Sequence, residues 1–317
     1  MPRTPKLPTE PPTVDRVRGG TSSNPTPAAV AAGEASPPSA RELSWCRACQ
    51  APSNGADGCL RCGQIQPVRD GILEAIGELA GRNRIVAAFY DGPGWRRFRK
   101  WERLFLAIQG GARRARMEIL RHLLTLNRPT ARVLEVGIGD GENLPLLPAS
   151  WTIYGADISR VQLESCQQRH PEVRGRLAWA EAEALPFPDG TFDACYSIGG
   201  FTYFSDHTAA WRELNRVTRS GGWVVVADER PGLHRAGIGH LIGLPALDRI
   251  WLGRLGLDPE FIDMVLRHDF VISSWCGEVW PRPEVRSIWH GLGYCLVHRV
   301  AGAEFVGLRN ASRGELP

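Results

Sequence analysis

Residues 133–143 read VLEVGIGDGEN, and this stretch decides the fold expected for most of the chain. The apolar run at residues 133–136 is typical of a buried parallel strand. It leads into a glycine-spaced turn made of Gly137, Gly139 and Gly141. Glycines allow a sharp turn, and they let a ligand touch backbone that no side chain covers. The stretch therefore indicates a ligand-binding loop, with an ordinary strand-to-helix connection as the alternative.

Acidic residues around this turn indicate the type of ligand. Asp157 ends a second apolar strand, TIYGAD. It follows the first glycine by about 20 residues, the separation expected of an acid that holds a ribose. Glu135, Asp140 and Glu142 lie in the turn region itself. Their charge disfavours the pyrophosphate of a dinucleotide and favours a nucleoside with a cationic amino-acid tail and a sulfonium.

Strand and helix patterns alternate from residue 131 onward. Apolar runs predict further strands at RLAWAEA, TFDACYSIGG and WVVVADE, and helical patterns begin after Ser159 and at His207. This alternation predicts an α/β fold with a doubly wound parallel sheet that binds ligands at the carboxyl ends of its strands. Near the end of the chain, YCLVHRV and EFVGLRN flank residues 301–303 and predict a closing hairpin.

Composition divides the rest of the chain into segments. Residues 1–43 are rich in Pro, Ala, Ser and Thr, and we expect a disordered leader because few large apolar side chains are available for burial. Residues 44–70 contain two Cys-x-x-Cys pairs, and residues 71–130 show a helical pattern. Residues 231–285 break the strand–helix alternation, and we interpret them as an insertion that covers the site.

The helical segment carries an aromatic stripe opposite a basic face. The stripe consists of Trp95, Phe98, Trp101, Phe105 and Ile108, at steps of three and four residues. Such a helix can lie on an anionic membrane or contact a phosphate backbone. Packing on the sheet with a solvated basic face is the favoured interpretation.

The two cysteine pairs predict a metal site. Cys46 and Cys49 form the first pair, and Cys59 and Cys62 form the second. Four thiolates can hold Zn²⁺ tetrahedrally at about 2.3 Å, and in a cytoplasmic protein such pairs indicate metal more often than a disulfide. The nine-residue gap between the pairs leaves room for a tight hairpin. We therefore expect a structural zinc ribbon, with redox use of one pair as the alternative.

Composition and charge narrow the class of protein. A chain of 317 residues with 43% hydrophobic and 23% charged residues is typical of a globular protein. The net charge of +4 permits an acidic partner without indicating one. No apolar run reaches the roughly 18 residues that a membrane span needs. The N-terminus shows no secretory signal, so we expect a cytoplasmic location.

Four stretches, in order, resemble the class I S-adenosylmethionine-dependent methyltransferases, closest to the ubiquinone- and menaquinone-biosynthesis-like branch. They are VLEVGIGDG, GADIS, EAEALPFPDGTFDACYS and ELNRVTRSGGWVVVADE. The resemblance covers about residues 85–310. It implies a seven-stranded Rossmann-like sheet in a methyltransferase domain at residues 131–310, with S-adenosyl-L-methionine as cofactor. A Cys-x-x-Cys ribbon ahead of such a domain resembles a known accessory arrangement.

By position, the resemblance also implies which residues bind the cofactor. The glycine loop would contact its amino-acid end, with Glu135 supporting the loop. Asp157 would accept hydrogen bonds from the ribose hydroxyls, and Ile158 would contact adenine. Glu181, in place of the commoner Asp, and the alanine after it would meet the edge of adenine. The carbonyl of Ser197 would take the ammonium. The implied set is Glu135, Gly137, Gly139, Gly141, Asp157, Ile158, Glu181, Ala182 and Ser197.

Three functions are open from the sequence. Methyl transfer to a small acceptor, including a lipophilic one, is favoured because aromatic-rich segments at residues 89–105 and 240–290 supply apolar walls. The second is an RNA methyltransferase that grips phosphates with the ribbon and the basic helix. The third is a non-catalytic scaffold that binds the cofactor. The catalytic residues are not predicted; candidate bases by location are Tyr90, Asp91, Tyr203, His207 and His240.

Overall fold

The fold is taken from a computed structural model of the chain. It describes residues 36–46, 48–49, 51–53, 58–230, 244–267 and 270–301, without the side chains of Trp101, Glu102 and Pro245. The chain divides into two units, Met1–Ser36 and Pro37–Pro317, and the fold described below belongs to the second.

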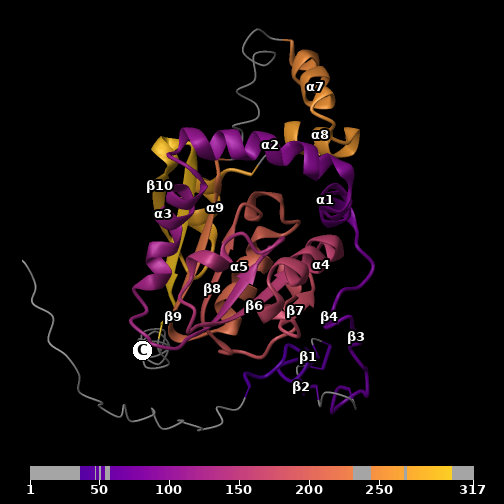
Figure 1. Cartoon of the computed structure of the whole chain (residues 1–317), viewed down its shortest axis with the longest axis vertical. Coiled ribbons are helices and arrows are strands. Elements are labelled where there is room, and N and C mark those ends of the chain that lie inside the picture. The colour runs from indigo at the N-terminus through magenta and orange to yellow at the C-terminus, as the bar shows by residue number, and fades with distance from the viewer. Residues whose placement is uncertain are drawn as a thin grey trace, which may run out of the picture. The chain divides into compact units, whose positions relative to one another are not determined.

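A nine-stranded mixed sheet forms the centre of this unit, in the order β10-β11-β9-β8-β5-β6-β7-β4-β3 (Figure 1). Strands β4 to β9 run parallel, whereas β11 is antiparallel to β9, and β10 and β3 are antiparallel to their neighbours. The bounds are β3 Val68–Arg69, β4 Ile72–Glu74, β5 Arg132–Val136, β6 Thr152–Asp157, β7 Leu177–Trp179, β8 Phe192–Ile198, β9 Thr218–Glu229, β10 Glu284–Ile288 and β11 Gly293–Arg299. The predicted doubly wound α/β sheet is confirmed.

Helices cover both faces of the sheet, and α2 crosses its upper end in Figure 1. The bounds are α1 Gly81–Asp91, α2 Pro93–Ile108, α3 Ala112–Leu124, α4 Arg160–Arg169, α5 His207–Val217, α7 Pro245–Arg254, α8 Pro259–Leu266 and α9 Ile272–Glu278. Short 3-10 turns lie at Leu144–Leu146, Pro171–Val173, Ala182–Ala184, Phe201–Tyr203 and Trp289–Gly291.

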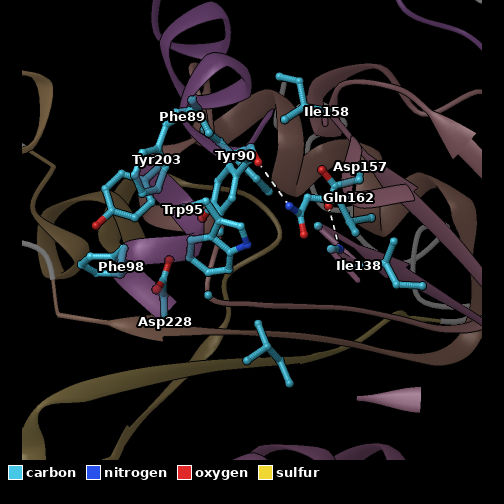
Figure 2. Close-up of a pocket in the computed structure, with 18 of the residues that line it drawn as sticks. Phe89, Tyr90, Trp95, Phe98, Ile138, Asp157, Ile158, Gln162, Tyr203 and Asp228 are labelled. Carbon is cyan, nitrogen blue, oxygen red and sulfur yellow. Dashed lines mark hydrogen bonds between the residues drawn. The ribbon is translucent and has the colours of Figure 1, made fainter. Parts of the chain in front are cut away.

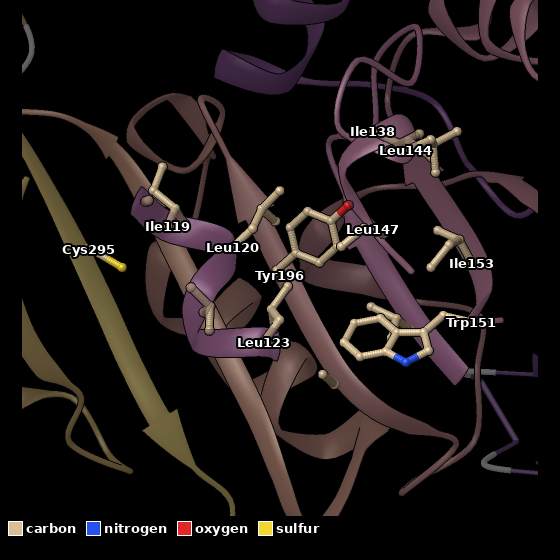
Figure 3. Close-up of a cluster of buried hydrophobic side chains, with 14 of the residues drawn as sticks. Ile119, Leu120, Leu123, Ile138, Leu144, Leu147, Trp151, Ile153, Tyr196 and Cys295 are labelled. Atoms are coloured by element: carbon tan, nitrogen blue, oxygen red, sulfur yellow. The ribbon is translucent and has the colours of Figure 1, made fainter. Parts of the chain in front are cut away.

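Two apolar cores lie on opposite faces of the sheet because successive side chains of a strand point to opposite sides. Val133 belongs to the core under α3 and α4, and its neighbour Leu134 belongs to the core under α5. Figure 3 shows the first core, where Leu120 and Leu123 of α3 lie beside Tyr196 of β8. The two cores bury both faces of the sheet. The carboxyl ends of its parallel strands all lie at one end of the sheet, and the site forms there.

The region expected to be helical from residue 71 begins instead with strand β4, which pairs in parallel with β7. Ile72 and Leu73 are both buried, one in each core. A short apolar run has the same pattern in a buried strand and in a buried helix. Residues 72–74 form a strand because they pair with β7 at the edge of the sheet. Ile108, expected within the buried stripe of α2, is 71% exposed.

The end of the segment expected to be a disordered leader packs on the sheet domain. Ala40 is 1% exposed, and its N–H donates to the carbonyl oxygen of Gly175 at 2.8 Å. The Tyr154 hydroxyl donates to the carbonyl oxygen of Pro38 at 2.5 Å. Composition averaged over residues 1–43 hides these few contacts. Residues 1–35 lie outside the described residues.

The closing hairpin has a different partner from the expected one. YCLVHRV lies in β11, which pairs with β10. EFVGLRN lies outside the described residues. The covering insertion contains three helices, α7 to α9, in its described part. Among the described residues, no helix has the length and apolar character needed to cross a bilayer.

Candidate functional site

A cavity opens at the carboxyl ends of β5, β6, β8 and β9, under α1, α2 and α8. Figure 2 shows aromatic side chains of α1 and α2 on one side of it and Ile138, Asp157 and Ile158 on the other. The cavity therefore lies where a doubly wound sheet is expected to bind its ligand.

The glycine loop presents backbone to this cavity. Gly137 and Gly139 line it with φ values of +75° and +55°, a region that favours glycine. A Cβ added to Gly139 would meet nothing within 4 Å, so its backbone faces open space. Gly141 does not line the cavity; a Cβ there would lie 2.9 Å from the sulfur of Cys166. Its role in the structure is close packing against α4.

Asp157 fixes the loop from the end of β6. Its carboxylate accepts hydrogen bonds from the backbone N–H groups of Gly139 and Ser159, both at 2.8 Å. It is 8% exposed, and this burial raises its pKa to about 6. Asp157, Ile158 and Ala182 all line the cavity, as three of the implied cofactor contacts should.

Glu135 supports the loop from below. Its carboxylate accepts hydrogen bonds from the Asn143 amide and the Tyr196 hydroxyl, both at 2.6 Å. The side chain is fully buried, which raises its pKa to about 7. The hydrogen bond to Asn143 joins the strand to the far end of the loop, in line with the supporting role that the resemblance implies.

The other two acids of the loop are engaged by arginines. Asp140 pairs with Arg99 of α2 and Arg169 of α4. Glu142 pairs with Arg99 and with Arg116 of α3. Sequence reasoning assigned these acids to ligand selection and the arginine to the basic face of the helix. Arg99 follows Trp95 by four residues and so shares its inward face, a signal that was present in the sequence.

Besides Gly141, two further implied contacts do not line the cavity. Glu181 accepts a hydrogen bond from the Asn83 amide at 2.9 Å, while Glu183 lines the cavity in its place. Ser197 is fully buried, and its hydroxyl has no hydrogen-bond partner among the described residues. The adenine-edge role of Glu181 and the ammonium role of Ser197 stay predictions.

A second acidic pair, which sequence reasoning missed, lies at the end of β9. Asp228 and Glu229 both line the cavity. Asp228 accepts N–H bonds from Thr202 and Glu229 at 2.8 Å, and burial raises its pKa to about 7. Glu229 accepts a hydrogen bond from the Tyr203 hydroxyl at 2.9 Å. The available signal was the ending of WVVVADE, because acids at the carboxyl end of a parallel strand face the ligand crevice.

The far end of the cavity is aromatic. Phe89 stacks on Phe261 with ring centroids 3.9 Å apart, and Trp95 and Phe98 of α2 extend the same wall (Figure 2). The indole N–H of Trp95 is buried without a hydrogen-bond partner among the described residues. This end suits a flat or apolar molecule, with a few polar groups to orient it.

Some of the candidate bases line the cavity and others do not. Tyr90 and Tyr203 line the cavity. Asp91 accepts a hydrogen bond from the Ser159 hydroxyl at 2.5 Å, and His207 stacks on Phe270 with ring centroids 3.8 Å apart. The last candidate, His240, lies outside the described residues.

The four cysteines of the two pairs come together beside β1 (Trp45–Cys46) and β2 (Ala51–Pro52). All four Sγ atoms lie within 4.8 Å of one another, and those of Cys46 and Cys62 are 3.8 Å apart. Zn–S bonds of about 2.3 Å in a tetrahedron place sulfurs about 3.8 Å apart. A backbone N–H bond from Cys62 lowers the pKa of Cys59 to about 6, whereas the side-chain contact with Cys62 raises the pKa of Cys49 to about 12. The donor set fits Zn²⁺.

Comparison with known proteins agrees with this geometry. Residues 134–226 match the family model described as a methyltransferase domain. The chain is 37% identical over 115 residues to demethylmenaquinone methyltransferase of Thermus thermophilus, covering 34% of this chain and 51% of that protein. It is 35% identical over 103 residues to 2-methyl-6-phytyl-1,4-hydroquinone methyltransferase of Synechocystis, covering 32% of each. The chain thus spans half the length of the first of these curated relatives and a third of the second.

A third relative and a solved structure extend the comparison. Fatty-acid O-methyltransferase of Mycolicibacterium smegmatis is 32% identical over 127 residues, covering 36% of this chain and 46% of that protein. A SAM-dependent methyltransferase from Aquifex aeolicus is similar in structure with a TM-score of 0.38 and 16% identity, covering 59% of this chain and 93% of that chain. The matched family model confirms the resemblance to class I methyltransferases that the sequence motifs indicated.

Proposed function

We propose that this chain, whose residues 134–226 match the model of a methyltransferase domain, transfers the methyl group of S-adenosylmethionine to a small lipophilic acceptor. One observation carries the proposal: a single cavity is lined both by Asp157 and the glycine loop and by a set of aromatic side chains. We call this aromatic end, lined by Phe89, Trp95, Phe98 and Phe261 and also by Glu229, the aromatic chamber. The relatives support this acceptor class, because their names refer to two quinone-type substrates and a fatty acid.

The cavity as a whole is lined by more acids than bases, which suits a sulfonium. The cavity is lined by two arginines, Arg99 and Arg116, and by a larger set of acids: Glu135, Asp140, Glu142, Asp157, Glu183, Asp228 and Glu229. Asp157 would hold the ribose, and the open backbone at Gly139 would meet the amino-acid portion. Arg99 lines the cavity, and its guanidinium would lie near the cofactor's carboxylate.

The acceptor end would hold the group that is methylated. When bound, S-adenosylmethionine supplies a methyl on a sulfonium, whose displacement needs alignment and no proton for the leaving group. An acceptor hydroxyl or an activated carbon must lose a proton, and a carboxylate in the chamber can take it. We assign this role to Glu229, which the Tyr203 hydroxyl orients.

Incubation with methyl-labelled S-adenosylmethionine and fractionated cell extract tests the function. We expect label in the lipid-soluble fraction. Glu229→Gln should lower turnover about 100-fold while leaving the affinity for S-adenosylmethionine within twofold, since general-base catalysis contributes roughly 10²–10⁴ in rate. Glu278→Gln, on α9, is the matched control because that acid does not line the cavity.

Other outcomes separate the alternatives. Label in RNA, with salt-sensitive RNA retention, would favour an RNA methyltransferase. Cofactor binding without label in any fraction would favour a scaffold. Wild-type turnover in Glu229→Gln would refute its role as proton acceptor without affecting the assignment of methyl transfer.

We also propose that Cys46, Cys49, Cys59 and Cys62 hold a structural Zn²⁺. Metal binding would stabilise a segment whose own core is small: in its described part, the buried cluster consists of Cys46, Ala51 and Cys59. The cytoplasmic location stays a prediction.

A further inference from the structure

Helix α7 exposes an apolar face to solvent. Leu247, Ile250 and Trp251 follow one another at steps of three and one, so they lie on one side of the helix, and they are 45%, 51% and 55% exposed. Leu244, just before the helix, is also exposed. Clustered large apolar side chains on a surface mark a site of contact with a protein, a membrane or a ligand.

The opposite face of the same helix belongs to the cavity. Leu252 is 6% exposed and lines the aromatic chamber together with Leu257 and Phe261 from the turn and helix that follow. One short helix therefore separates the acceptor end of the cavity from the exposed apolar side chains. A partner that binds the exposed face of α7 would therefore lie close to the chamber.

Helix α2 adds positive charge beside it. Arg96, Lys100 and Arg103 are exposed at steps of four and three, which places them on one side of α2, away from Trp95 and Phe98 in the cavity. α2 lies next to the helices of the insertion in Figure 1.

The join between α2 and the insertion is tight. A Cβ at Gly256, in the turn after α7, would lie 2.6 Å from the guanidinium of Arg97. Helix α2 therefore packs at Arg97 against the turn that follows α7. The nearby acids at α8 are engaged: Asp258 caps the helix, Glu260 pairs with Arg84, and Asp263 pairs with Arg249 of α7.

We propose that α7 and α2 dock this protein on the surface of an anionic lipid bilayer, with the apolar side chains of α7 inserted among the lipids and the basic side chains of α2 against the headgroups. Apolar side chains beside Lys and Arg are the combination that binds such a surface. A polyanion such as RNA would meet the arginines and lysine but would leave the exposed leucine, isoleucine and tryptophan of α7 in water. Docking would open the acceptor chamber beside the membrane.

Co-sedimentation of the full-length protein with vesicles tests this directly, without cofactor or acceptor. The vesicles are phosphatidylcholine alone or equal parts of phosphatidylcholine and phosphatidylglycerol. We expect binding to the anionic vesicles, at least fivefold weaker binding to the neutral ones, and weakening by salt, because salt screens the headgroup attraction. Because no turnover is measured, failure of the methyl-transfer proposal would leave this result unaffected.

Paired variants separate the two contributions. Ile250→Ser/Trp251→Ser should lower binding to anionic vesicles at least fivefold, and Lys100→Gln/Arg103→Gln should lower it and reduce its salt dependence. Val285→Ser removes an equally exposed apolar side chain on β10, and Arg69→Gln/Arg174→Gln removes two exposed charges near β4; both should bind as wild type. Thermal melting and S-adenosylmethionine binding check that each variant is folded.

Three results would overturn the proposal. The first is wild-type protein that stays in the supernatant with anionic vesicles at low salt. The second is equal loss of binding in the control and test variants. The third is retention of RNA, but not vesicles, that depends on Lys100 and Arg103.

Discussion

Asp157 combines two tasks in one carboxylate. It holds the N–H groups of Gly139 and Ser159, and it also lines the cavity where a ribose would lie. A group that shapes the loop and binds the ligand should be sensitive to the loss of its charge, even when its size is kept.

Asp157→Asn tests the ribose assignment. An amide presents an N–H₂ group where the carboxylate accepts hydrogen bonds, so one donor in the loop or the ligand loses its partner. We expect the Kd for S-adenosylmethionine to rise about 10- to 100-fold, since hydrogen bonds to a charged group contribute roughly 1.5–3 kcal/mol. Calorimetry measures the Kd. Glu164→Gln, an acid on α4 that does not line the cavity, should bind as wild type. An unchanged Kd in Asp157→Asn would refute the assignment.

Three buried acids predict a pH dependence of cofactor binding. Burial raises the pKa of Asp157 to about 6 and those of Glu135 and Asp228 to about 7. These groups are partly protonated near pH 6, and a bound sulfonium lowers their pKa values. Binding should therefore release protons, and affinity should rise between about pH 5 and 8. Calorimetry in buffers of different ionisation enthalpy would detect the release; equal heats in all buffers near pH 6.5 would contradict it.

The same acids affect stability with the opposite dependence on pH. Between about pH 4 and 7 the folded protein without ligand binds more protons at these sites than the unfolded chain does. Their contribution to the free energy of unfolding therefore falls as pH rises through that range.

Local sequence indicated the cavity-lining residues that lie where a strand runs into its own turn, and it did not indicate contacts between segments far apart in the chain. Gly139 and Asp157 are set by adjacent strands, and both line the cavity. Glu181 is turned by Asn83, which lies 98 positions earlier in the chain, and Arg99 reaches the loop from a helix that sequence placed outside it. Such contacts depend on how elements meet, which periodicity does not encode.

At the scale of elements, α2 acts as a cover fastened to the glycine loop. Arg99 joins this helix to Asp140 and Glu142, and the same helix supplies Trp95 and Phe98 to the cavity wall. The proposed cofactor site lies beneath α2, so the contacts between this helix and the loop should slow cofactor release.

Arg99→Gln should therefore speed cofactor release. Asp140 and Glu142 keep Arg169 and Arg116 as partners, so the loop remains folded. We expect the dissociation rate of S-adenosylmethionine to rise about tenfold, equivalent to roughly 1.4 kcal/mol, measured by stopped-flow competition. Arg96→Gln removes an exposed charge from the same helix and should release the cofactor at the wild-type rate. A slow Arg99→Gln variant would show that α2 does not retain the cofactor.

The cysteine cluster makes a separate prediction at this scale. Elemental analysis of purified protein should find one zinc per chain, and Cys59→Ser/Cys62→Ser should lose it and melt at a lower temperature. Cys276→Ser, at a half-buried thiol outside the cluster, should keep its zinc. Full metal content in the double variant would exclude a Cys₄ site.

For the whole molecule, the boundary between the two units predicts where the chain can be shortened. Removal of residues 1–36 should leave the melting temperature and cofactor affinity unchanged, because the second unit begins at Pro37. Removal of residues 1–43 also deletes buried Ala40 and the Pro38 carbonyl that Tyr154 binds. It should cost about 1–3 kcal/mol of unfolding free energy, measured by denaturant titration. Equal stability of the two truncations would refute this boundary.

The strand pair β3–β4 extends the sheet beyond the seven strands that the sequence motifs implied. It also changes how the molecule meets others of its kind. Without it, β7 would offer an unpaired row of peptide groups on which a neighbouring chain could add a strand. Instead the sheet finishes in β3, which is two residues long and ends at the exposed Arg69. An edge strand this short and charged offers few backbone groups to which a strand of another chain could add in a fibril.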